Sequence, residues 1–176
     1  RPFENLQADG SIGEPAVRQL IDFVRQGTEL AEDKGATEVI AFATSAMRDA
    51  ANGESVLRRL REETGLDVQV LSGEDEARMT FLAVRRWFGW SSGRIVLLDI
   101  GGGSLEIASG TDEEPDAAVS LPLGAGRLTR DFISTDPAAP DDVRAMRKHA
   151  RAVIAEATGR IRRVGEPNLA VATSKT

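Results

Sequence analysis

The stretch Asp99-Ile100-Gly101-Gly102-Gly103-Ser104-Leu105-Glu106 lies between two segments that have the composition of strands. Residues 94–98 form a short apolar run of the buried-strand type, and apolar and polar residues alternate again over 105–109. This pattern predicts a strand, a glycine turn and a returning strand. Three glycines remove every Cβ atom that would hold an anion away from the backbone, so consecutive N–H groups can converge on phosphate oxygens.

Polar side chains flank the glycines on both sides. Asp99 could hold Mg²⁺ through its waters, Ser104 could donate to a phosphate, and Glu106 shares a strand face with Ser104 because side chains alternate with a period of two. A glycine-rich hairpin can also be purely structural. The dinucleotide-binding and P-loop fingerprints both need a helix directly after the glycines, whereas a strand follows here. The pattern therefore favours the phosphate-binding hairpin of the actin-like fold.

Composition restricts the class of protein. The chain has 176 residues, is 41% hydrophobic and carries a formal net charge of −6, so it can bury a core in one large or two small domains. It has no Cys, no apolar run that could cross a bilayer and no basic and apolar leader, from which we expect a cytoplasmic protein with no membrane partner. The acidic balance argues against a nucleic-acid partner. A polyanion would need a local basic patch, although arginines on helices more often face solvent; the candidates are Arg78, Arg85, Arg86, Arg127 and Arg130.

Hydrophobic periodicity predicts an α/β protein. Helices are expected over 14–33, 54–64, 72–88 and 141–164 with a short one after Gly126, and strands over 38–43, 67–71, 94–98, 105–109, 117–121 and 168–172. Asn52 is expected to cap the second helix. The expected buried face of the third helix consists of Met79, Leu82, Ala83 and Trp87. Residues 89–93 form a short break, which predicts a first domain over 1–92 and a second over 93–176.

Four stretches together carry a resemblance to a known family. They are Ala43–Asp49, Leu71–Arg78, the Asp99–Glu106 hairpin and Ser120–Thr129. In this order they resemble the exopolyphosphatase and guanosine pentaphosphate phosphatase family along nearly the whole chain. The resemblance implies an actin-like (ribonuclease H-like) two-lobed fold, with mixed sheets flanked by helices.

The resemblance also implies roles for single residues. Glu76, which directly precedes Ala77-Arg78, resembles the proposed general base, and Arg48 resembles a phosphate ligand. From the residues alone, Glu76 could instead offset the dipole of its helix, and Arg48 could pair with Asp49 or with Glu62 and Glu63. Lys175 stands where the family has a glycine, so it could add a cation or block a close approach. Metal binding would fall to Asp99 and Glu106, and phosphate binding further to Gly101, Gly102, Gly103, Ser104 and Lys175.

By resemblance, the chain is expected to be part of a Mg²⁺-dependent hydrolase that releases terminal phosphate from inorganic polyphosphate. Guanosine pentaphosphate is the alternative substrate, and a homodimer is one option for the assembly. The family's first phosphate turn and its C-terminal helical extension have no counterpart in residues 1–176, so a longer protein is expected. A non-catalytic sensor of an alarmone or of polyphosphate would need phosphate donors but no base. A sugar or acetate kinase would need an adenosine pocket beyond residue 176.

Overall fold

The computed structural model describes residue 7 and residues 9–174. The chain divides into two compact units, Arg1–Leu71 and Ser72–Thr176. The first unit contains α1 (Glu14–Asp33), β1 (Ala41–Ala43), α2 (Ser45–Arg48), α3 (Gly53–Thr64) and β2 (Val68–Val70). Strands β1 and β2 form a parallel pair and are shorter than predicted, whereas α1 has the predicted bounds.

Helices α1 and α3 pack against each other through an apolar core. Val17 and Ile21 of α1 are buried in one cluster with Val56 and Leu60 of α3. Their spacing of four residues turns one stripe of each helix inward, as the periodicity predicted.

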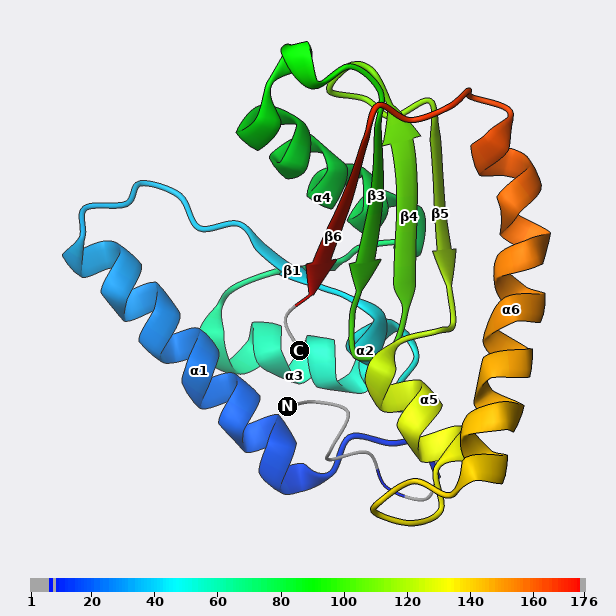
Figure 1. Cartoon of the computed structure of the whole chain (residues 1–176). Coiled ribbons are helices and arrows are strands. Elements are labelled where there is room, and N and C mark those ends of the chain that lie inside the picture. Colours follow the sequence, from blue (N-terminus) through cyan, green and yellow to red (C-terminus); the bar gives the residue numbers. More distant parts are fainter. Residues whose placement is uncertain (1–6, 8, 175–176) are drawn as a thin grey trace. The chain divides into compact units, whose positions relative to one another are not determined.

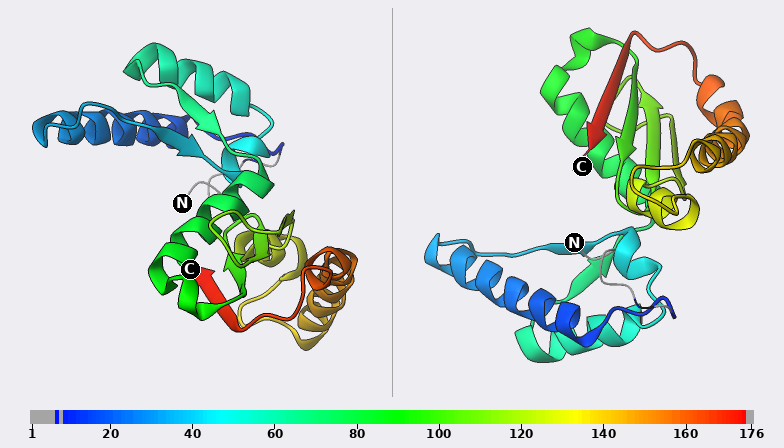
Figure 2. Two further views of the ribbon diagram at one scale, coloured as in Figure 1. Left: turned by 90° about the horizontal axis from the view of Figure 1, so that it is seen from above. Right: turned by 60° about the horizontal axis from the view of Figure 1, so that its bottom comes forward.

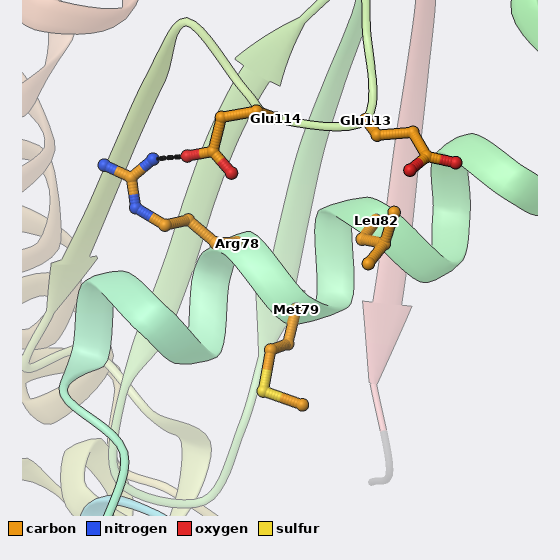
Figure 3. Close-up of a pocket in the computed structure, with 5 residues that line it drawn as sticks. All are labelled: Arg78, Met79, Leu82, Glu113 and Glu114. Atoms are coloured by element: carbon orange, nitrogen blue, oxygen red, sulfur yellow. Dashed lines mark hydrogen bonds and ion pairs between the residues drawn. The ribbon is translucent and has the colours of Figure 1, made fainter.

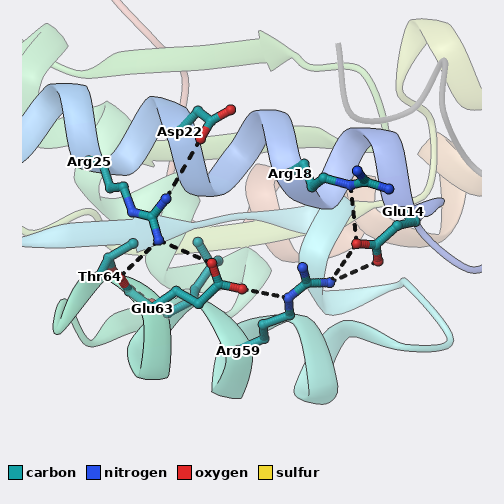
Figure 4. A network of polar contacts seen from close by, with 8 residues as sticks. Glu14, Arg18, Asp22, Arg25, Arg59, Glu63 and Thr64 are labelled. Carbon is teal, nitrogen blue, oxygen red and sulfur yellow. Dashed lines mark hydrogen bonds and ion pairs between the residues drawn. The ribbon is translucent and has the colours of Figure 1, made fainter.

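A network of ion pairs joins the exposed edges of these two helices (Figure 4). Arg59 donates to both carboxylate oxygens of Glu14, at 2.9 and 2.8 Å, and its Nε donates to Glu63 at 2.7 Å. Arg25 donates to the other carboxylate oxygen of Glu63 at 3.1 Å. The hydrogen bonds from Arg59 lower the pKa of Glu14 and the pKa of Glu63. Because exposed ion pairs are individually weak, the network supplements the apolar core.

Asn52 is the N-cap residue of α3, as predicted, but its side chain makes no capping hydrogen bond. Its Oδ1 accepts from the Ile12 N–H at 2.8 Å, and its Nδ2 donates to the Ile12 carbonyl at 2.9 Å. Ile12 is buried, and its backbone needs both a donor and an acceptor, which one side-chain amide supplies together.

The second unit is built on a four-stranded mixed sheet with the order β5-β4-β3-β6, in which β6 is parallel to β3 and the other neighbours are antiparallel. Helix α4 covers one face of this sheet and α6 covers the other (Figures 1 and 2). The predicted fold class, α/β with mixed sheets flanked by helices, is confirmed. The elements are α4 (Gly73–Phe88), the short 3-10 helix η2 (Trp90–Ser92), β3 (Ile95–Ile100), β4 (Leu105–Gly110), β5 (Ala117–Leu121), α5 (Ala125–Phe132), α6 (Pro140–Arg162) and β6 (Leu169–Ser174).

Helices pack on both faces of this sheet. Ile95 of β3 packs with Phe81 of α4, while Ile107 of β4 packs with Ala157 of α6. Every residue of β4 is buried, including the polar Glu106. The alternation of apolar and polar residues over 105–109 therefore does not mark a side that faces solvent. The alternation instead places the carboxylate of Glu106 on the face of the sheet that α4 covers.

The predicted buried face of α4 is wrong. Ala77, Phe81 and Val84 are the apolar residues of this helix that the sheet buries. Large apolar residues occur all round α4, so periodicity could not choose between its faces, and the small Ala77 permits the close approach to the strands. In the predicted set, Leu82 is half-buried and the exposed residues are Met79, Ala83 and Trp87.

Helix α4 packs on the strands of the second unit, so the compact units separate before it, at Leu71–Ser72. The boundary predicted from the sequence falls after α4, and the domains 1–92 and 93–176 stay a prediction. Within the described ranges, no helix is long and apolar enough to cross a membrane.

Candidate active site

The glycine turn joins β3 to β4 as predicted. Strand β3 ends at Ile100 and β4 begins at Leu105, and these two residues are paired in the antiparallel register. The Gly101 N–H donates to the Ser104 carbonyl at 2.9 Å, which closes the turn. The prediction of a strand, a glycine turn and a returning strand is confirmed.

Three carbonyls of the turn are held by the beginning of α5. The Ala125 N–H donates to the Gly101 carbonyl at 2.9 Å, and the Arg127 N–H donates to the Gly102 carbonyl at 3.0 Å. The Nε of Arg127 donates to the Gly103 carbonyl at 2.8 Å. All three carbonyls therefore face α5.

The N–H groups of the turn face the opposite way. The turn peptides are trans, since the cis peptide bond among the described residues is Asp136-Pro137. In a trans peptide the N–H points away from the carbonyl of the same unit, so Gly102, Gly103 and Ser104 direct their N–H groups away from α5. No hydrogen bond within the described residues occupies these three N–H groups. Consecutive N–H groups on one side of a turn form an anion-binding surface.

A row of polar residues crosses the sheet next to the turn. Asp99 on β3 is paired with both Thr173 on β6 and Glu106 on β4, and Glu106 is paired with Ser120 on β5. Paired residues point to the same face of a sheet. Asp99 follows Leu97 with the period of two, so this polar row (Thr173, Asp99, Glu106 and Ser120) lies on the face that α4 covers.

The polar row contains one fully buried carboxylate. Glu106 is 1% exposed, and its Oε1 accepts a hydrogen bond from the Ser120 hydroxyl at 2.7 Å. Beside the half-buried Asp99, the Oγ1 of Thr173 is buried and makes no hydrogen bond within the described part of the chain. The sequence pointed to both carboxylates but not to Ser120 or Thr173. Only the pairing of β4 with β5 and of β3 with β6 brings these hydroxyls to the row.

Glu76 lies in the first turn of α4, and the side chain of Ser72 caps this helix. The next residue, Ala77, is buried in the cluster that contains Ala118 of β5. On the same face of β5, the neighbour of Ala118 toward the glycine turn is Ser120. Glu76 is half-buried, with a buried Oε2, at the end of α4 nearest the polar row.

The polar row fits Mg²⁺ that is shared with a phosphate. Among the described residues, no group of three or more His, Cys, Asp or Glu side chains could hold a metal ion. Mg²⁺ commonly takes one or two carboxylates and completes its shell with waters and phosphate oxygens. Asp99 and Glu106 provide two carboxylates on one face, and the buried hydroxyl of Thr173 adds an oxygen whose hydrogen-bonding capacity is unused within the described residues.

Arg48 belongs to the first unit, so it is described apart from the turn. Its Nη1 donates to the Leu71 carbonyl at 2.8 Å, and its Nε lies 3.7 Å from the Asp49 carboxylate. The pairing with Asp49 that the sequence left open is therefore present. Lys175 lies outside the described residues.

The five arginines named as candidates for a basic patch make other contacts in the second unit. Arg85 is fully buried and donates to backbone carbonyls, among them that of Gly110 at 2.9 Å. Arg127 holds the Gly103 carbonyl. The other three pair with acidic residues, as Arg78–Glu114, Arg86–Glu113 and Arg130–Asp131.

A shallow cavity of about 340 Å³ lies between α4 and the β4–β5 connection (Figure 3). The ion pair between Arg78 and Glu114 forms part of its wall. The β4–β5 connection joins the strand ends opposite to the glycine turn, so this cavity is separate from the turn. It is lined by Arg78, Met79, Leu82, Glu113 and Glu114.

A family model, curated relatives and solved structures match this chain. The model of the Ppx/GppA phosphatase family matches residues 3–176. Exopolyphosphatase 1 of Mycobacterium bovis is 53% identical over 100% of this chain and 51% of its own length, and exopolyphosphatase 1 of Mycobacterium leprae is 50% identical over 100% of this chain and 52% of its own length. The chain thus spans about half the length of the curated relatives it matches.

Solved structures give the same result. An exopolyphosphatase from Cytophaga hutchinsonii matches with a TM-score of 0.84 at 28% identity, over 93% of this chain and 52% of that chain. The PPX-GPPA enzyme of Aquifex aeolicus matches with a TM-score of 0.68 at 30% identity, over 84% of this chain and 49% of that chain. These likenesses bear out the predicted fold class.

Proposed function

This chain belongs to the Ppx/GppA phosphatase family, and from that premise we propose that the whole protein releases terminal phosphate from inorganic polyphosphate. The observation that carries the proposal is the set of N–H groups at Gly102, Gly103 and Ser104, which face away from α5 next to two carboxylates. The names of the curated relatives, both exopolyphosphatases, support the choice of substrate.

The glycine turn would bind the terminal phosphate. Hydrolysis of a phosphoanhydride needs donors on the equatorial oxygens of the transferred phosphoryl group. N–H groups that are fixed before the substrate arrives need no reorganisation during the reaction. Backbone donors also suit a chain with a net charge of −6, because they bind an anion without a surplus of cationic side chains.

Asp99 and Glu106 would hold Mg²⁺ beside this phosphate. When bound, the ion neutralises charge on the phosphate oxygens. Ser120 keeps the buried carboxylate of Glu106 in one orientation by donating to its Oε1. A carboxylate held in this way presents its remaining lone pairs in a fixed direction.

We assign the role of general base to Glu76. A base has to lie within hydrogen-bond reach of the proton that it accepts, and the position of Glu76 at the end of α4 nearest the polar row supports this role. The alternative, compensation of the helix dipole, applies equally to all three acidic residues of the first turn, Glu74, Asp75 and Glu76. Glu74 pairs with Arg160 at 3.1 Å, and the Asp75 N–H donates to the Ser72 hydroxyl at 3.1 Å.

The test is phosphate release by the purified full-length protein from polyphosphate and from guanosine pentaphosphate, each with and without Mg²⁺. We expect Mg²⁺-dependent release from polyphosphate, with the Glu76→Gln variant as the background control. Faster release from guanosine pentaphosphate would assign that substrate instead. Binding of either compound without turnover would favour a sensor, and a folded protein that neither binds nor hydrolyses them would contradict the proposal.

A further inference from the structure

The Gly124–Arg127 segment at the start of α5 touches the glycine turn at every peptide whose N–H faces the proposed ligand. We propose that this segment is a positioning element for phosphate binding, and that Arg127 acts through the Gly103 carbonyl. This inference rests on the proposed function of the same site.

The three hydrogen bonds from α5 fix the direction of three peptide planes. The donors are the N–H groups of Ala125 and Arg127 and the Nε of Arg127. A run of glycines is conformationally free, so an unrestrained peptide in this turn can rotate and present its carbonyl where the N–H had been. A carbonyl oxygen repels a phosphate oxygen. Each bond from α5 therefore keeps one donor directed at the anion.

Gly124 brings α5 close enough to make these bonds. A Cβ atom at Gly124 would lie 2.3 Å from the carbonyl carbon of Gly103 and 2.4 Å from the nitrogen atoms of Gly103 and Ser104. Its backbone angles, φ −68° and ψ 152°, are open to any residue. The contact with the turn, and not the backbone conformation, therefore requires glycine at this position.

A Lys substitution distinguishes the Nε hydrogen bond of Arg127 from its positive charge. A Lys side chain keeps the positive charge but has no donor at the place of Nε. If Arg127 attracted the polyanion through its charge, Lys would largely preserve binding. If Arg127 holds the Gly103 carbonyl, Lys would not.

The test compares Gly124→Ala and Arg127→Lys with wild type in the full-length protein, by calorimetric titration with tripolyphosphate and by steady-state phosphate release. The matched control is Gly159→Ala in α6, where nothing lies within 4 Å of an added Cβ. We expect both variants to bind tripolyphosphate about tenfold more weakly than wild type and to raise KM more than they lower kcat, because one restraint on a donor is lost. The control should bind like wild type.

Folding is checked by thermal unfolding. If the Gly124→Ala variant does not fold, the affinity of the Arg127→Lys variant for tripolyphosphate tests the inference. Wild-type affinity in a folded Arg127→Lys variant would overturn the assignment of Arg127, and wild-type affinity in both variants would overturn the whole inference. A wild-type protein that binds tripolyphosphate without hydrolysing it would contradict the proposed function, while the comparison of affinities would still decide this inference.

Discussion

Replacing Glu76 with Gln keeps the size of the side chain and removes the proposed proton acceptor. General-base catalysis contributes about 10²- to 10⁴-fold, which corresponds to about 2.7–5.4 kcal/mol of transition-state stabilisation. The base acts in the chemical step, so kcat should fall by this factor while KM for polyphosphate changes little. The assay is steady-state phosphate release by the full-length protein at saturating polyphosphate and Mg²⁺.

Glu74→Gln is the matched control, since it makes the same change two residues earlier on the same helix. Glu74 pairs with Arg160 through side chains that are 47% and 59% exposed, and an exposed pair contributes about 0.2–1 kcal/mol to stability. This control should therefore keep a turnover within about twofold of wild type. Near-normal turnover of Glu76→Gln, or an equal loss in both variants, would refute the assignment of the base.

Three further predictions concern the metal, the polyanion and the first unit. Asp99→Asn should raise the Mg²⁺ concentration for half-maximal activity by about tenfold, because one anionic ligand becomes neutral; coincident metal titration curves would remove Asp99 from the metal site. Arg48→Ala should raise KM more steeply for long than for short polyphosphates, and an equal rise for both would argue that Arg48 does not contact the polyanion. Arg59→Met should lower the Tm of the full-length protein at neutral pH. Because the pKa of Glu14 and the pKa of Glu63 lie below the ordinary value of 4.5, the stabilisation by Arg59 is present above that value and is lost as the pH falls through the lowered pKa values. The Tm difference from wild type should therefore close in acid, and a difference that does not depend on pH would contradict the assignment.

Local signals were sufficient for the helices and for the hairpin. The bounds of α1 could be predicted because Pro15 lies in its first turn and Gly35, with φ of 74°, follows its end. The glycine turn could be predicted because an apolar run precedes the glycines, an alternating strand pattern follows them, and no helix pattern follows. Both predictions use only residues that are adjacent in the sequence.

The rest depends on contacts between segments that are far apart in the sequence. Thr173 reaches Asp99 only through the pairing of β6 with β3. The buried face of α4 is chosen by the sheet beneath it, and its sequence offers apolar residues on several sides. Its charge made Arg127 a candidate for a basic patch. In the structure its Nε instead donates a hydrogen bond to the Gly103 carbonyl. No local pattern distinguishes these two uses of an arginine.

The central claim is that the N–H groups of the glycine turn hold the terminal phosphate. The most direct measurement is a crystal structure of the full-length Glu76→Gln variant with Mg²⁺ and tripolyphosphate. We expect oxygens of one terminal phosphate within about 2.7–3.2 Å of the backbone nitrogens of Gly102, Gly103 and Ser104, with the metal ion on the side of Asp99. A tripolyphosphate bound elsewhere, with these three N–H groups bonded to water or to other protein atoms, would contradict the claim.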